Sequence, residues 1–196
     1  MVAPLLVIRP IAQPAPDLTG VAALAFTSAN GVEAFATLTP DRTRPVFAVG
    51  DATAEAATAA GFASVNSAAG AIADLARLLI AEAPRRGAVL VPGAREPAGD
   101  LGAMLSGRIE ARPLPVYVSL ETGAAAPPAF DAVMVHSPRA ARALAALGPF
   151  ADQTAVAFSQ AVAAPLRAVP GLDVRVASRP DEAALLEALG NPARRV

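Results

Sequence analysis

The chain of 196 residues lacks cysteine, lysine and tryptophan altogether, and it contains one histidine, His136, and one tyrosine, Tyr117. Without cysteine there can be no disulfide, thiolate metal site or cysteine nucleophile. A single histidine argues against a histidine-rich metal site and against a serine–histidine–aspartate triad. All 16 basic residues are arginines, so an anionic ligand must be bound by guanidinium groups or by neutral donors such as backbone N–H groups.

The sequence also lacks a surplus of positive charge and any long apolar run. Its net charge is −1, whereas nucleic-acid-binding proteins usually carry a strong basic surplus. No apolar run approaches the roughly 18 residues of a membrane span, and no basic segment precedes the short apolar stretch at the start. We therefore expect no nucleic-acid partner, no membrane association and a cytoplasmic location.

What is present is a well-packed composition, with 54% hydrophobic residues, in which short apolar runs alternate with alanine-rich helical patterns. This alternation predicts an α/β protein with parallel sheets and helices on both faces. The strands are expected at 5–8, 22–26, 45–49, 88–91, 114–118, 131–135, 154–158 and 173–177. The helices are expected at 30–38, 52–60, 70–82, 98–106, 138–147, 160–168 and 181–189.

The order of landmarks indicates an internal duplication. Ser28 ends one strand and Gly50 ends the next, 22 residues later, and the same spacing separates Ser137 from Ser159. A glycine follows each pair at a similar distance, and a helix pattern follows each glycine. Two proline-rich stretches, 9–20 and 121–130, are the best candidates for linkers.

Small polar residues directly follow the predicted strands in LAFTSANGVEAF (24–35) and VMVHSPRAARAL (133–144). α/β proteins usually bind ligands at the carboxyl ends of their strands, where helix N-termini offer free N–H groups to anions. The alternative is that these residues are ordinary helix caps, and the two interpretations are compatible.

Several of these segments, in this order, resemble the uroporphyrinogen-III synthase family. The matching segments are LLVIRP, FTSANGVEAF, AVGDATAEAATAAGF, VYVSLET, VHSPRAARAL and VASRPDEAALLEAL. The resemblance implies two related flavodoxin-like or Rossmann-like α/β domains, joined by two extended linker strands, with a ligand cleft between them. It implies one domain from 1–18 plus 123–196 and an inserted domain from 19–119.

The chain departs from the family's pattern in two places. Only 16 residues separate Pro10 from Thr27, so the terminal domain is expected to lack the family's first helix and second strand. Its sheet should then have four strands rather than five, with the N-terminal strand as one of them. The second departure is at Ser159–Val162, where the family often has a glycine and a pair of threonines.

The resemblance implies an enzyme that cyclises the linear tetrapyrrole hydroxymethylbilane to uroporphyrinogen III, with loss of water and inversion of the last ring. No metal or cofactor is needed. Because the substrate bears eight carboxylates and cyclises by itself without the inversion, the protein must mainly position it. A monomer is expected.

Candidate site residues follow from the strand ends and from the family's motifs. Tyr117, in the family's VY motif, is the candidate for assisting loss of the hydroxyl group; a packed core tyrosine is the alternative. The expected substrate-binding residues are Arg9, Thr27, Ser28, Asn30, Thr53, Arg95, Ser137 and Ser159. Capping, core packing or surface ion pairs are the alternatives for these, and His136 is interpreted as a structural residue.

Two other functions remain open from sequence. One is a non-catalytic tetrapyrrole-binding or scaffold protein of the same fold, suggested by the shortened N-terminal region. The other is an unrelated two-domain solute-binding protein, which the absence of an export signal disfavours.

Overall fold

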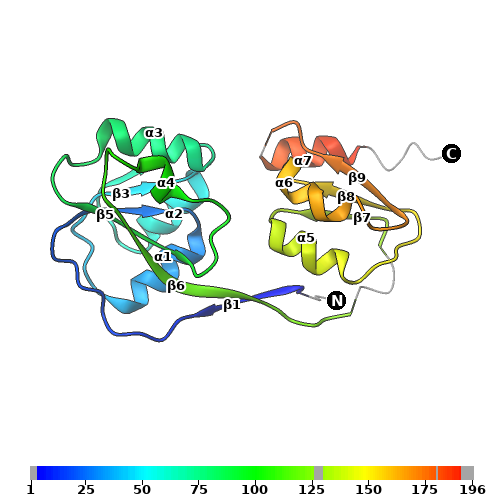
Figure 1. Cartoon of the computed structure of the whole chain (residues 1–196), viewed down its shortest axis with the longest axis horizontal. Helices are drawn as coiled ribbons and strands as arrows, with labels where there is room; N and C mark the ends of the chain where they lie inside the picture. Colours follow the sequence, from blue (N-terminus) through cyan, green and yellow to red (C-terminus); the bar gives the residue numbers. More distant parts are fainter. Residues whose placement is uncertain (1–3, 126–129, 180, 191–196) are drawn as a thin grey trace. The chain divides into compact units, whose positions relative to one another are not determined.

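The computed structural model describes residues 4–125, 130–179 and 181–190. The chain forms two compact units, of which unit 1 comprises Met1–Val7 and Leu120–Val196, and unit 2 comprises Ile8–Ser119. Both are built mainly from parallel strands and from helices (Figure 1), which confirms the α/β class predicted from the alternating pattern.

Unit 2 is organised around a six-stranded sheet in the order β1-β6-β5-β2-β3-β4. Its strands are β1 (Leu6–Pro10), β2 (Val21–Phe26), β3 (Val46–Ala48), β4 (Val65–Ser67), β5 (Ala88–Ala94) and β6 (Ala111–Glu121). The ladders from β6 through β5, β2 and β3 to β4 are all parallel. The central strands are apolar along their whole length because helices cover both faces of the sheet.

Helices cover both faces of this sheet (Figure 1), and each face has its own core. The helices of unit 2 are α1 (Ala29–Leu38), α2 (Asp51–Ala59), α3 (Ile72–Glu82) and α4 (Leu101–Leu105). On one face α1 and α2 pack against alternate strand residues such as Leu24 and Phe26. On the other face α3 and α4 pack against the intervening residues, including Ala23 and Ala25. The period-2 alternation of side chains within β2 thus separates the two cores.

The N-terminal strand does not take the place expected for it. The backbone N–H of Ile11 donates to the oxygen of Val116 at 2.9 Å, and that of Thr122 donates to the oxygen of Leu5 at 3.0 Å. These two bonds show that β1 runs antiparallel to β6. The expectation of a fourth strand in the terminal-domain sheet is therefore wrong for the described residues, because β1 pairs with the edge of the six-stranded sheet.

Unit 1 contains a three-stranded parallel sheet in the order β7-β8-β9. Its elements are β7 (Ala132–Val135), α5 (Pro138–Ala145), β8 (Gln153–Ala157), α6 (Gln160–Ala163), η1 (Ala164–Leu166), β9 (Leu172–Val176) and α7 (Glu182–Leu189). The helices α5, α6 and η1 cover one face, whereas α7 packs against the other. The predicted helix 160–168 is interrupted because Pro165 has no N–H to continue it.

The landmarks of the sequence repeat occupy equivalent positions in the two units. Ser28, Gly50, Ser137 and Ser159 are the N-cap residues of α1, α2, α5 and α6. Each unit contains three successive strand–helix pairs whose strands are neighbours in chain order, β2-β3-β4 in unit 2 and β7-β8-β9 in unit 1. In unit 2, β5 and α4 follow as a fourth pair. β4, the third strand of the repeat in unit 2, is missing from the predicted strand ranges because VNS is short and polar.

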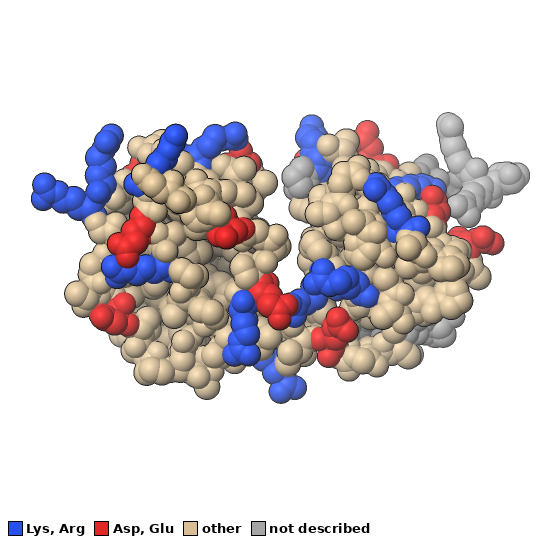
Figure 2. All heavy atoms as spheres, in the orientation of Figure 1, with Lys and Arg blue, Asp and Glu red and all other residues tan. Residues whose placement is uncertain are grey.

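Charged side chains of both signs lie on the surface of the two units (Figure 2). Figure 2 shows arginines interspersed with acidic side chains over the viewed face of both units, in keeping with a net charge of −1. No helix within the described residues is long and apolar enough to cross a membrane.

Arg42 joins the ends of two helices in unit 2. Its guanidinium donates to the backbone oxygens of Ala36 at 3.0 Å, Thr39 at 2.7 Å and Ala60 at 2.8 Å. It also lies 4.9 Å from the centre of the Phe62 ring. The last carbonyl groups of a helix have no partner within the helix, so this side chain supplies donors that the ends of α1 and α2 require.

We expect Arg42→Ala to lower the free energy of unfolding by about 2–3 kcal/mol, because several carbonyl groups lose a charged donor at once. The free energy of unfolding of Arg42→Lys should fall between those of the wild type and Arg42→Ala, since an ammonium group cannot reproduce the planar set of donors of a guanidinium group. Urea unfolding followed by circular dichroism measures both. Arg77→Ala, whose side chain is 77% exposed, is the control and should change stability by less than about 0.5 kcal/mol. Equal effects of the two alanine variants would contradict this role.

Candidate functional site

The polar stretches of unit 2 gather at one edge of its sheet. Because β2, β3, β5 and β6 are parallel, their carboxyl ends point the same way. Thr27 follows β2, Gly50 follows β3 after one residue, and Arg95 follows β5 directly. Tyr117, within β6, pairs with Ala94 at the end of β5 and so lies at the same edge.

Ser28 begins helix α1 in extended backbone conformation, with φ −163° and ψ 153°. Its Oγ accepts a hydrogen bond from the backbone N–H of Gly31 at 3.2 Å. A serine in this conformation is a favoured N-cap because its side chain satisfies one of the free N–H groups of the first turn. The capping interpretation of Ser28 is therefore correct, and it leaves the remaining hydrogen-bonding capacity of the hydroxyl for another partner.

That partner is Tyr117. The phenol oxygen of Tyr117 lies 2.9 Å from Ser28 Oγ, and either hydroxyl can be the donor. The ring is buried, with the residue 8% exposed, in the core that contains Phe26, Val32 and Leu90. The backbone oxygen of Tyr117 accepts a hydrogen bond from the N–H of Arg95 at 2.9 Å. Tyr117 is thus a packed core residue whose polar end reaches the carboxyl edge of the sheet.

The close approach of α1 to the sheet depends on a glycine. A Cβ atom on Gly31 would lie 2.9 Å from the backbone oxygen of Pro92 in β5, which is closer than real side chains come. The glycine therefore lets the first turn of α1 lie directly against β5. Gly31 stands within the sequence motif FTSANG, yet only the sheet order, with β5 between β2 and β6, reveals why a side chain is not tolerated there.

The other predicted residues of unit 2 differ in their accessibility. Thr27 and Asn30 are half-buried at the start of α1, and Thr53 is buried in the first turn of α2 with 6% exposure. Arg9 in β1 and Arg95 after β5 are exposed. Within the described part of the chain, neither guanidinium makes a hydrogen bond or an ion pair. The structure thus joins Ser28 to Tyr117, and the substrate-binding roles stay predictions.

Unit 1 shows the same capping chemistry at its strand ends. Ser137 Oγ accepts from the N–H of Ala140 at 3.1 Å, and Ser159 Oγ accepts from the N–H of Val162 at 3.4 Å. The two serines follow the parallel strands β7 and β8 and begin α5 and α6. Substrate contact by either serine stays a prediction.

Sequence reasoning missed the surroundings of His136. Its Nε2 lies 3.0 Å from a carboxylate oxygen of Glu182, and its ring centre is 5.6 Å from that of Phe158. His136 follows β7 and Phe158 follows the neighbouring strand β8, so adjacent parallel strands bring them to one edge. The proximity of His136 to Phe158 could have been inferred from the strand order, whereas Glu182 was predicted only to lie within the helix expected at 181–189.

Asp181 caps α7 at the same edge of unit 1. Its Oδ1 accepts from the N–H of Ala184 at 2.8 Å, and its Oδ2 accepts from Arg179 Nε at 3.0 Å. The backbone hydrogen bond from Ala184 lowers the pKa of the Asp181 carboxyl below its usual 3.8, and Arg179 adds to this effect. The cap therefore stays ionised at neutral pH.

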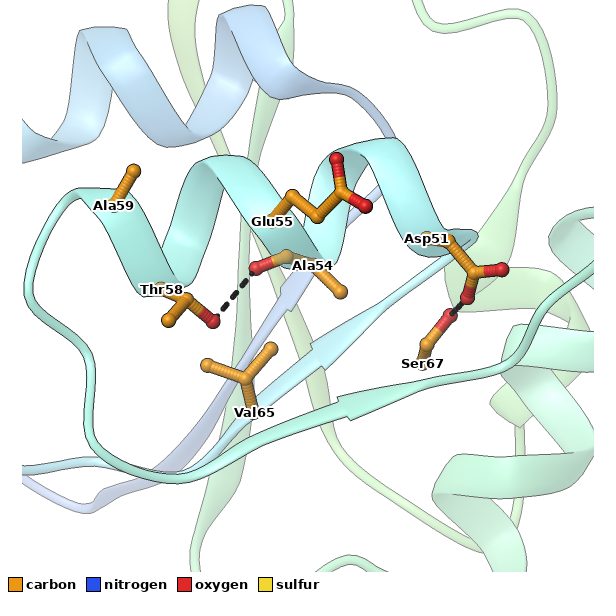
Figure 3. Close-up of a pocket in the computed structure, with 7 residues that line it drawn as sticks. All are labelled: Asp51, Ala54, Glu55, Thr58, Ala59, Val65 and Ser67. Carbon is orange, nitrogen blue, oxygen red and sulfur yellow. Dashed lines mark hydrogen bonds between the residues drawn. The ribbon is translucent and has the colours of Figure 1, made fainter.

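An open hollow of about 590 Å³ lies elsewhere on unit 2, between α2 and β4 (Figure 3). It is lined by two carboxylates, Asp51 and Glu55, and Ser67 donates a hydrogen bond to Asp51 at 2.7 Å. Carboxylates repel a further anion at close range, so this hollow does not suit a polyanionic ligand. None of the predicted site residues lines it.

Comparison with known proteins gives a consistent result. The family model described as uroporphyrinogen-III synthase HemD matches residues 1–187. Among solved structures, the uroporphyrinogen-III synthetase of Helicobacter pylori 26695 is 20% identical, with a TM-score of 0.67 and coverage of 93% of this chain and 88% of that one. A mutant uroporphyrinogen III synthase of the extremely thermophilic bacterium Thermus thermophilus is 16% identical, with a TM-score of 0.55 and coverage of 96% and 87%. No curated protein matches the chain.

Proposed function

Because this chain belongs to the uroporphyrinogen-III synthase family, whose model matches residues 1–187, we propose that it closes hydroxymethylbilane to uroporphyrinogen III. The reaction removes the terminal hydroxyl group as water and inverts the last ring before closure. The family match over almost the whole chain carries this proposal. The parallel α/β fold shared with the two solved synthases supports it.

Tyr117 is the proposed proton donor. As the carbon–oxygen bond of the hydroxymethyl group breaks, the departing oxygen takes the phenol proton and leaves as water. The pyrrole nitrogen supplies the electron pair that forms the electrophilic azafulvene. A ring proton is lost when the attacking pyrrole regains its aromaticity, and this proton restores the acid. The Ser28 hydroxyl, 2.9 Å from the phenol oxygen, can stabilise the phenolate in between.

Helix N-termini are the proposed carboxylate-binding groups. The first turns of α1, α2 and α5 each present backbone N–H groups and the positive end of a helix dipole to an approaching anion. Thr27, Asn30 and Thr53 in unit 2 and Ser137 in unit 1 are the proposed neighbours of these groups. Ser159, the N-cap of α6, is a further proposed contact. Arg9 and Arg95 are the proposed guanidinium contacts, since neither guanidinium group makes a hydrogen bond or an ion pair among the described residues.

We also propose that the substrate is held by two domains, one of 1–18 plus 123–196 and one of 19–119, that each contribute strand-end loops. In this proposal, two linker strands join the domains, and the domains enclose a cleft for the substrate. The monomeric state and the cytoplasmic location are predictions from the sequence. Size-exclusion chromatography with light scattering tests the first of these.

The decisive experiment is an assay that resolves the product isomers. Purified protein with hydroxymethylbilane should form mainly the type III isomer, whereas heat-denatured protein should give only the type I isomer of spontaneous closure. Type I product alone from folded protein would refute the synthase function. Tight binding of tetrapyrrole without isomer selectivity would instead indicate a non-catalytic binding protein of the same fold.

A further inference from the structure

We propose that Ser28 is a positioning residue that holds the phenol of Tyr117 in place, rather than a residue that binds substrate carboxylates. This inference rests on the proposed role of Tyr117 as the proton donor. The two residues lie 89 positions apart in the sequence, and their hydroxyl oxygens are 2.9 Å apart. The contact therefore exists only because the sheet brings β2 and β6 near each other.

The hydroxyl of Ser28 is largely committed to the protein. It has one proton to donate and two lone pairs to accept with, and one lone pair already accepts the N–H of Gly31 at 3.2 Å. When the remaining proton is donated to Tyr117, three groups point in one direction, from Gly31 N–H to Ser28 O–H to the Tyr117 phenol. In this arrangement the phenol keeps its own proton available for a group outside the protein.

The location of this chain of donors favours transfer of that proton. It begins in the first turn of α1, where the helix dipole carries partial positive charge that stabilises a nearby anion. The phenolate left after proton transfer would keep its hydrogen bond from Ser28, which is strengthened when the acceptor becomes charged. The arrangement therefore stabilises the product of proton transfer more than the starting phenol.

The rest of the tyrosine is fixed by packing. The residue is 8% exposed and belongs to the core with Phe26, Val32 and Leu90. Gly31 keeps α1 tight against β5, since a Cβ there would meet the Pro92 oxygen at 2.9 Å. With the ring packed in the core and the helix held against β5, the Ser28 hydroxyl is placed to orient the phenol oxygen through its hydrogen bond.

The chain provides a direct readout of this contact, because Tyr117 is its only tyrosine and it has no tryptophan. The near-ultraviolet circular dichroism and fluorescence bands of tyrosine therefore report Tyr117 alone. We expect Ser28→Ala to change both bands while the far-ultraviolet spectrum stays unchanged. It should lower kcat for type III product about tenfold with KM within about twofold, which is the signature of an interaction made in the transition state.

Two variants separate positioning from helix capping. Ser28→Thr keeps a hydroxyl at the same position and should restore both the tyrosine spectrum and kcat. Asp100→Ala removes another N-cap of unit 2, where Asp100 Oδ1 accepts from Ala103 N–H at 2.9 Å. This control should lower thermal stability, as loss of a cap does, and leave the tyrosine bands and kcat unchanged.

Each other outcome has a defined meaning. An unchanged tyrosine spectrum in Ser28→Ala, or a raised KM with unchanged kcat, would overturn the inference and return Ser28 to the substrate-binding residues. Failure of the wild-type protein to form type III product would refute the synthase function and with it the catalytic part of the inference. If Ser28→Ala nevertheless changed the tyrosine spectrum, the contact between Ser28 and Tyr117 would still be supported. Failure of the synthase function and failure of the contact are therefore distinguishable.

Discussion

Replacement of Gly171 by alanine is expected to lower the free energy of unfolding by about 4 kcal/mol, enough to remove most of the stability of a small domain. Gly171 lies in the turn before β9 with a φ of +76°, a conformation that side chains rarely adopt. A Cβ atom there would overlap the backbone oxygen of Phe150 and lie 2.6 Å from its carbonyl carbon. Because both contacts are with backbone, no side-chain rotation can relieve them.

The clash would also disturb a neighbouring hydrogen bond. The N–H of Phe150 donates to the oxygen of Pro170 at 3.0 Å, so the segment before β8 and the turn before β9 are held together at this point. Moving Phe150 to make room for a methyl group would strain this bond and the contact of its ring with Phe130, whose centre is 5.7 Å away. The damage should therefore be concentrated in unit 1.

Gly107→Ala is the matched control for Gly171→Ala. Its φ is +75°, yet no atom lies within 4 Å of the position that a Cβ would take. It should cost about 1 kcal/mol, the strain of the backbone conformation alone. Urea unfolding measures both variants, and hydrogen exchange shows which unit is affected. Similar losses in the two variants would show that the Phe150 contact contributes nothing.

Tyr117→Phe is expected to lower kcat for type III product about a hundredfold, since a positioned acid typically contributes at least this factor. The substitution removes one oxygen atom and leaves the ring that packs against Phe26 and Leu90. KM should change little, because the phenol is proposed to act on the departing hydroxyl group and not on the carboxylates. Initial rates with the type I background subtracted provide the measurement.

The control removes a hydroxyl group from the same unit away from the tyrosine. Thr37 in α1 donates its hydroxyl proton to the oxygen of Ala34 at 2.8 Å, so Thr37→Val loses a hydrogen bond without touching Tyr117. Its kcat should equal that of the wild type. Far-ultraviolet circular dichroism should show that both variants are folded. An unchanged rate in Tyr117→Phe would remove this residue from the catalytic mechanism.

Short segments of the sequence predict much of the architecture. The apolar run Val21–Phe26 predicts a strand buried on both faces, and Ser28 and Ser137 predict the starts of α1 and α5 within one residue. These features are local, because capping and strand burial depend on a few consecutive residues. The repeat of serines and glycines predicts the recurrence of one plan in both units for the same reason.

The errors occurred where a partner far along the chain decides the outcome. β4 (Val65–Ser67) has a weak strand pattern, and it forms because Val65 pairs with Val46 of β3. The N-terminal strand has an ordinary apolar pattern that fits several neighbours, and its backbone bonds to Val116 and Thr122 determine which one it takes. Local propensity does not specify such pairings.

The sequence by itself determined the α/β class, the order of most strands and helices, and the family. It determined these because they depend on periodicity, caps and motifs that adjacent residues carry. Only the tertiary structure decided that the phenol of Tyr117 meets the hydroxyl of Ser28, and that α1 needs Gly31 beside Pro92. Those contacts depend on β5 lying between β2 and β6, an order set by packing among distant segments.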